Sequence, residues 1–260
     1  MEGPNGDVLI RMAAGLEEFQ QCVDIQGAVW GYEDSDIVPR RMFLLAMKIG
    51  GQVVGAFAGD GKMIGFAMAL PAYREGTAYL HSHMLAVLPE YRNAGLGRRL
   101  KLAQRDDAIA RGIERMEWTY DPLETKNAYL NIAKLGAISR RYEANFYGAS
   151  TSVLQGGLPT DRLYAEWWLR SERVENVLSG EAATVEPLER VVVPKQVAEW
   201  KAAAELRPRA EAVQTANRIA LQDAFATGLA IVGYERDAEG NGVFLLGNLE
   251  KSTTLGVDVR

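Results

Sequence analysis

The 260-residue sequence predicts an α/β fold, because strand-like and helix-like segments alternate along its first 170 residues. Two observations carry this prediction. Apolar segments flank Gly59-Asp60-Gly61, which is a strong signal for a β-hairpin. Further along, an apolar strand ending at Val87 leads through a glycine turn into a basic helix. Together they indicate a sheet with helices packed on it.

Each element follows from periodicity and from breaker residues. The first segment alternates apolar and polar residues, as a half-buried strand does, and the next places apolar residues at helical spacing from Phe19 to Val29. Pro39 favours the start of a second helix, which Gly50-Gly51 ends. The expected order is strand 8–12, helices 17–30 and 40–49, strands 53–58, 63–69 and 79–87, helix 97–111, strand 116–120, helix 127–135 and strand 163–169.

The composition changes after Ser171, where Glu and Val become frequent and Pro187 and Pro194 interrupt the chain. A helix is expected over 210–227, followed by strands 230–234 and 243–246 around a glycine-containing turn. We therefore predict two domains: residues 1–170, and an αββ extension over residues 171–260. The extension is expected to pack on the core or to lie at a homodimer interface.

The overall composition excludes several classes of protein. Hydrophobic residues make up 48% and charged residues 24%, which is ordinary for a globular protein. A net charge of −5 argues against nucleic-acid binding, and neither a membrane-spanning segment nor a secretory signal is expected. The single cysteine, Cys22, lies in an apolar helical pattern and is expected to be a core thiol in a cytoplasmic protein. The histidines and the cysteine show no metal-binding spacing.

Residues 84–105 are the most informative segment. Its turn reads Arg92-Asn93-Ala94-Gly95-Leu96-Gly97, and residues 92–105 hold five cationic side chains and no acidic one. Two glycines let the backbone turn tightly and approach a ligand closely. The helix that follows presents unpaired N–H groups and the positive end of its dipole. This arrangement predicts a binding site for a phosphate.

Comparison with the motifs of known phosphate-binding loops indicates which kind of phosphate ligand the turn would bind. A dinucleotide fingerprint requires a third glycine where Leu100 stands, and a Walker A loop requires Gly-Lys-Ser/Thr, which Gly97-Arg98-Arg99 does not provide. The pattern Arg-x-x-Gly-x-Gly after a strand ending Leu85-Ala86-Val87 resembles instead the pyrophosphate loop of the GNAT (GCN5-related N-acetyltransferase) superfamily. The alternative is an ordinary loop before an exposed basic helix.

A second motif extends the resemblance. Asn127-Ala128 and Ala133-Lys134-Leu135-Gly136-Ala137 are similar to the asparagine-containing helix of GNAT proteins that ends in Lys-Leu-Gly. Over residues 8–170 the resemblance implies the GNAT fold, a mixed, mostly antiparallel twisted sheet flanked by helices, with a C-terminal α+β extension. His81-Ser82-His83-Met84 and residues 118–123 further resemble a GNAT subgroup with a long C-terminal extension, some of which look like amino-acid N-succinyltransferases.

The resemblance also implies a co-substrate site for acetyl-CoA or another short acyl-CoA, without a metal. Three residues of the strand would contact pantetheine and the thioester carbonyl: Leu85, Ala86 and Val87. The following segment would bind pyrophosphate, and one asparagine would contact coenzyme A: Arg92, Asn93, Gly95, Leu96, Gly97, Arg98 and Asn127.

The catalytic groups are open to several interpretations. His81 and His83, the only histidines, lie two apart on one strand and so face the same side. Histidine titrates near neutrality, so His83 is the first candidate base, followed by His81 and then Glu117 or Asp121. Either histidine could instead serve only in structural hydrogen bonds.

The tyrosine that many GNAT enzymes use as the acid for the leaving thiolate is replaced here by Ile132. Tyr142 or Tyr147 could replace it, or the thiolate could leave unassisted. Arg140 and Arg141 could clamp a carboxylate of the substrate or be surface residues, and Trp167-Trp168 are expected to pack in the core.

The function expected from these features is that of an N-acyltransferase. It would move an acetyl or succinyl group from acyl-CoA to the amine of a small molecule, with amino acids among the candidates. The amine would attack directly in a ternary complex. The alternatives are a non-catalytic acyl-CoA-binding or interaction module and a protein-lysine acetyltransferase.

Overall fold

A computed structural model describes residues 8–148, 150, 152, 154–181 and 186–249. The chain forms two compact units: the first runs to Glu117 and includes 151–153, and the second comprises 118–150 and 154–260. The division falls inside one strand, earlier in the chain than the boundary expected after residue 170. Each unit is described by itself.

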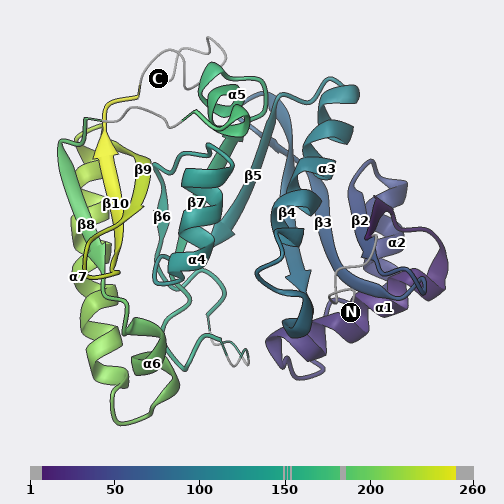
Figure 1. The fold of residues 1–260 in the computed structure, drawn as a ribbon, viewed down its shortest axis with the longest axis horizontal. Coiled ribbons are helices and arrows are strands. Elements are labelled where there is room, and N and C mark those ends of the chain that lie inside the picture. Colours follow the sequence, from purple (N-terminus) through teal and green to yellow (C-terminus); the bar gives the residue numbers. More distant parts are fainter. Residues whose placement is uncertain (1–7, 149, 151, 153, 182–185, 250–260) are drawn as a thin grey trace. The chain divides into compact units, whose positions relative to one another are not determined.

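The first unit contains the predicted strands and helices up to residue 117 (Figure 1). Its strands lie in the order β1-β2-β3-β4-β5, with antiparallel neighbours except for the parallel pair β4 and β5. The elements are β1 Leu9–Met12, α1 Gly15–Trp30, α2 Arg40–Lys48, β2 Gln52–Phe57, β3 Met63–Arg74, β4 Thr77–Val87, the 3-10 helix η1 Pro89–Tyr91, α3 Leu96–Ala110 and the start of β5 Arg115–Tyr120.

The core of this unit lies between the sheet and its helices. Phe43 of α2 packs edge-on against Phe66 of β3, with ring centroids 5.6 Å apart, and both are fully buried. Cys22 of α1 belongs to the same cluster and is fully buried, as expected for a core thiol. Helix α3 contributes Leu96 and Leu100 to this core. Burial of these apolar side chains fixes the start of α3 against the sheet.

Strand β4 departs from regular pairing in its middle. Its register with β3 shifts between the pairs Met68–Met84 and Leu70–His81. Two residues of β3 thus span the same length as three residues of β4, so β4 carries a β-bulge at Ser82 and His83. The parallel ladder with β5 consists of two pairs, at Leu80 and His81. Among the described residues, the β4 segment from Ser82 to Val87 therefore pairs with β3 alone.

The second unit continues the strand order as β5-β7-β6 and adds a separate antiparallel sheet, ordered β8-β10-β9 (Figure 1). Ser139, just before β6, forms an antiparallel bridge with Ile231 of β9. The elements are α4 Thr125–Ala128, the π-helix η2 Tyr129–Lys134, β6 Tyr142–Glu143, β7 Arg162–Trp168, α5 Glu172–Ser179, β8 Glu189–Val193, α6 Val197–Ala202, α7 Arg207–Ala226, β9 Ala230–Arg236 and β10 Gly242–Gly247.

Several of these elements differ from the sequence prediction. The helix expected over 127–135 begins two residues earlier and continues as a π-helix before Gly136, whose φ of 76° ends it. The extension contains α5, β8 and α6 in addition to the predicted helix and two strands, and β6 was not predicted. Trp167 and Trp168 are buried, which confirms their role in packing.

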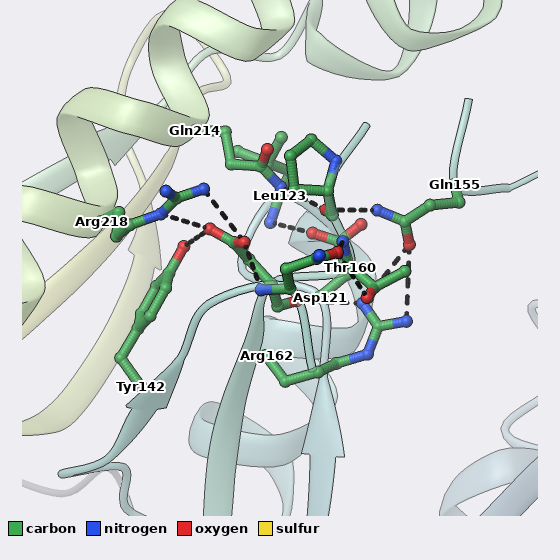
Figure 2. A network of polar contacts seen from close by, with 11 residues as sticks. Asp121, Leu123, Tyr142, Gln155, Thr160, Arg162, Gln214 and Arg218 are labelled. Carbon is green, nitrogen blue, oxygen red and sulfur yellow. Dashed lines mark hydrogen bonds and ion pairs between the residues drawn. The ribbon is translucent and has the colours of Figure 1, made fainter. Parts of the chain in front are cut away.

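A buried carboxylate ties α7 to the hairpin of β6 and β7. Asp161 is fully buried, and Arg218 of α7 approaches it with two nitrogens, at 2.8 and 3.1 Å. The Tyr142 hydroxyl and the Asn145 N–H also donate to Asp161, at 2.5 and 3.0 Å (Figure 2). Because a buried carboxylate requires such partners, this network stabilises the second unit.

Candidate functional site

The glycine turn lies between the end of β4 and the start of α3. Two residues of it adopt the left-handed conformation, Asn93 with a φ of 63° and Gly95 with a φ of 74°. A Cβ atom at Gly95 would have no heavy atom within 4 Å, so the backbone faces open space there. The first bond of the α3 ladder runs from the Arg99 N–H to the Gly95 carbonyl. The N–H groups of residues 96–98 therefore precede the ladder, as an anion site requires.

The cations around the turn differ in their surroundings, and Arg99 donates to the Val8 carbonyl at 2.8 Å. The first turn of α3 carries no acidic residue, and Arg92 and Arg99 are exposed. Arg92 is held in place because its Nε donates to the Val87 carbonyl at 3.1 Å. Lys101 differs: it is only 1% exposed and lies on the buried face of α3. One of the five expected cations therefore faces the sheet rather than a ligand.

The predicted pantetheine contacts lie on the free edge of β4. Leu85 and Val87 are half-buried and Ala86 is buried, and all three pair with β3 on the other side. Backbone groups of this edge make no strand ladder with β5 in the described part of the chain. They can therefore bond an extended amide-containing chain, which fits the pantetheine arm of coenzyme A.

Of the two histidines, His83 belongs to the bulge of β4 and His81 directly precedes it. Their ring centroids are 6.3 Å apart. The side chain of His83 is accessible, yet the protein around it partly desolvates the ring, which lowers the pKa of His83. A lowered pKa keeps the imidazole neutral, and hence able to accept a proton, at neutral pH.

The carboxylates considered as bases are engaged in ion pairs. Glu117 is 1% exposed and is approached by Arg74 at 2.9 Å and by Arg115 at 3.5 Å. Asp121, in the second unit, is buried and pairs with Lys201 at 2.7 Å. Both carboxylates are therefore occupied by cations of the protein itself.

The candidates for the missing acid differ in their surroundings. Ile132 is buried in the second unit and has no proton to donate. Tyr142 donates its hydroxyl proton to Asp161, and burial with this bond raises the pKa of Tyr142 far above its ordinary value. Tyr147 is exposed, and its hydroxyl lies 3.4 Å from that of Thr119 on β5. Of the two tyrosines, Tyr147 is the exposed one.

The remaining candidates lie in the second unit. Asn127 is exposed on α4. Arg140 and Arg141 line a pocket of about 490 Å³ between β6 and the end of α7. Both arginines pair with the buried carboxylate of Glu166, at 3.0 and 3.5 Å. The carboxylate that they clamp in this structure is therefore an internal one.

The described residues also bear on metal binding and on membrane insertion. No group of three or more His, Cys, Asp or Glu side chains there is arranged to hold a metal ion. No helix in the same part of the chain has the length and apolar character needed to cross a membrane.

Comparison with known proteins agrees with this geometry. Residues 16–131 match the model of the acetyltransferase (GNAT) family. No curated protein matches the chain significantly. Solved structures show the same fold at low sequence identity. One is yncA from Salmonella typhimurium, determined with its cofactor acetyl-CoA, at 17% identity and a TM-score of 0.51, over 64% of this chain and 96% of that one.

Two further structures are similar to the same degree. The acetyltransferase of the GNAT family from Streptococcus pneumoniae has 18% identity and a TM-score of 0.50, over 62% of this chain and 98% of that one. The protein smu.2055 from Streptococcus mutans has 16% identity and a TM-score of 0.51, over 62% of this chain and 99% of that one. The predicted resemblance and fold class are thus confirmed: residues 16–131 match the model of the acetyltransferase (GNAT) family, and the solved structures share the fold.

Proposed function

We propose that the protein transfers a short acyl group, acetyl or succinyl, from acyl-CoA to the amine of a small molecule such as an amino acid. One observation carries the proposal. The unpaired edge of β4 runs directly into a left-handed turn at Asn93 and Gly95 and then into the start of α3. An amide-containing arm and a pyrophosphate follow one another in coenzyme A in the same way.

The chain's own groups would perform three tasks. N–H groups at residues 96–98 and the side chain of Arg92 would hold the pyrophosphate. Backbone groups of Leu85 and Val87 would align the pantetheine arm, whereas those of Ala86 face β3, because hydrogen-bonded pairs alternate and the Leu88 N–H donates to the Ile64 carbonyl. An N–H of this edge would donate to the developing oxyanion. In a dry site one such donor contributes about 3 kcal/mol. Coenzyme A itself supplies the activated thioester.

His83 is the proposed base. Its accessible ring is kept neutral by partial desolvation, so it can take a proton from the acceptor's ammonium group and leave the free amine to attack the thioester carbonyl. His81, with its ring 6.3 Å from that of His83, is the second candidate. Glu117 ranks below both because Arg74 and Arg115 pair with it. A thiol of pKa near 8.5 can leave unassisted, so the transfer requires no acid for the thiolate.

A thermal-shift measurement tests the co-substrate. Acetyl-CoA and succinyl-CoA are expected to raise the melting temperature, because a ligand that binds only the folded state stabilises it. S-acetylpantetheine is the matched control, since it carries the same thioester without the pyrophosphate, and it should give a much smaller shift. The proposal fails if neither acyl-CoA shifts the melting temperature at millimolar concentration.

A panel of acceptors tests the reaction. Release of free thiol from each acyl-CoA would be followed with amino acids, simple amines and a lysine-containing peptide. Turnover with amino acids or small amines supports the proposal, whereas turnover with the peptide alone would identify a protein-lysine acetyltransferase.

A non-catalytic acyl-CoA-binding module is the second candidate. It is favoured by Ile132, which stands where the family acid is expected and is buried. Acyl-CoA binding without thiol release across the whole panel would establish this alternative instead.

A further inference from the structure

Helix α3 carries two polar side chains on its buried face. Leu96, Leu100 and Ala108 form the apolar stripe expected of a helix packed on a sheet, but Lys101 and Gln104 lie among them. Lys101 is 1% exposed and Gln104 is fully buried. Lysine is almost never buried so completely without a specific partner. Its position therefore requires an explanation from its contacts.

Those contacts lead to the bulge of β4. The Lys101 Nζ donates to the Ser82 hydroxyl at 2.7 Å, and this hydroxyl donates to the Gln104 Oε1 at 2.9 Å. Ser82 is 3% exposed and is one of the two residues that form the bulge, the other being His83. The extra residue of a bulge is not held by the regular ladder, so these side-chain bonds supply a restraint that the ladder lacks.

The same network extends across the sheet. The Gln52 side chain of β2 donates to the Gln104 carbonyl at 2.8 Å and to Asp107 at 2.7 Å. Helix α3 is thereby tied to β2 and to the bulge of β4 by buried polar bonds. Such bonds specify one geometry, because breaking any of them leaves a buried polar group without its partner.

We infer that Lys101 and Ser82 are positioning residues, which clamp the β4 bulge so that His83 and the following backbone edge keep the geometry needed for acyl transfer. The inference rests on the proposed function. Ser82 turns towards α3, while the His81 and His83 rings lie near each other. The helix that presents its N-terminus to the pyrophosphate therefore also sets the position of the proposed base. Burial lowers the pKa of Lys101 well below its ordinary value, because desolvation disfavours the charged amine.

Three variants of the full chain test the inference. Lys101→Met keeps the length and flexibility of the side chain without its amine, Ser82→Ala removes the hydroxyl, and Ser82→Thr retains it. Ser139→Ala is the matched control, because Ser139 is equally buried and its hydroxyl bonds to that of Tyr120 at 3.1 Å, with no bond to the Lys101–Ser82 network in the described part of the chain.

The expected result separates positioning from stability. Lys101→Met should change the melting temperature little, because removal of a desolvated amine offsets the lost bond to Ser82. Its kcat should fall about tenfold or more, with the KM for acyl-CoA changed less than about twofold, since small misplacements of reacting groups are costly. Ser82→Ala should lose turnover similarly, Ser82→Thr should recover most of it, and Ser139→Ala should turn over as the wild type does.

A spectroscopic readout decides the inference independently of activity. The chain has two histidines, so its imidazole NMR spectrum contains two sets of signals, which His81→Ala assigns. Lys101→Met and Ser82→Ala should move the His83 signals, and Ser139→Ala should not. Unmoved His83 signals together with a kcat within twofold of the wild type would overturn the inference. If the wild type binds no acyl-CoA, the proposed function fails, and the imidazole signals alone decide whether the clamp exists.

Discussion

Replacing Gly95 by alanine tests how much the left-handed backbone of the glycine turn contributes to the free energy of unfolding. The residue has a φ of 74° and a ψ of 4°, and an added Cβ would meet no heavy atom within 4 Å. The cost in the folded state is therefore backbone strain alone, about 1–2 kcal/mol for an L-residue in the left-handed region. Alanine also restricts the unfolded chain, which offsets about 0.4–1 kcal/mol of this strain. The expected loss in the free energy of unfolding is about 1 kcal/mol.

The chain supplies a matched control at the other end of the same helix. Gly112 has a φ of 75°, and a Cβ there would also meet nothing within 4 Å. Gly112→Ala should therefore lose the same free energy of unfolding as Gly95→Ala when both are measured by urea titration. The two variants differ only in which end of α3 they alter.

Ligand binding should distinguish the two variants. The methyl group of Gly95→Ala would stand in the open space before the helix N-terminus, where the pyrophosphate is proposed to lie. We expect the Kd for acetyl-CoA, measured by calorimetry, to rise about tenfold, which is about 1.4 kcal/mol. Gly112→Ala should bind with the affinity of the wild type. Equal affinities in both variants would refute the placement of the ligand, and an undiminished stability of Gly95→Ala would refute the strain argument.

Three further predictions follow from single residues. Arg218→Ala removes the cation from a fully buried carboxylate and should cost about 3 kcal/mol of unfolding free energy, whereas Arg190→Ala breaks an exposed pair and should cost less than about 0.5 kcal/mol. Burial raises the pKa of the Cys22 thiol to about 12, so the native protein should not react with a disulfide reagent at pH 8 and should expose one thiol in denaturant. Because the thiol ionises more easily when unfolded, this residue should also lower stability as the pH rises from 9 towards 12. If His83 is the base, kcat/KM should fall on the acidic side only below pH 6.5, because desolvation lowers the pKa of His83. The variant His83→Ala should lose this acidic fall in kcat/KM and should still bind acyl-CoA.

Local signals predicted the longer elements well. The Gly59–Gly61 turn and the apolar segments beside it become β2 and β3, and the basic helix becomes α3. Strand β6 was missed because two residues show no periodicity, and only its pairing with β7 defines it. Helix α5 carried a usable signal, since Ser171 caps it by accepting a hydrogen bond from the Val174 N–H.

The bulge in β4 has no comparable local signature. Its sequence, His81-Ser82-His83, alternates as an ordinary strand would. The extra residue becomes visible only when β4 is aligned against β3, because a bulge is a property of two paired strands. The same holds for the ion pairs of Glu117, whose partner Arg74 comes from a distant part of the chain.

By itself the sequence determined the glycine turn before α3, the family resemblance and the order of the main elements, because glycine placement, capping and periodicity act over a few neighbouring residues. The tertiary structure decided which side chains the site can use. Lys101 and Arg98 look alike in the sequence, yet packing of α3 on the sheet buries the first against Ser82 and leaves the second half-buried. The surroundings of a charged group depend on strands far apart in the chain, and these surroundings govern its pKa and its chemistry.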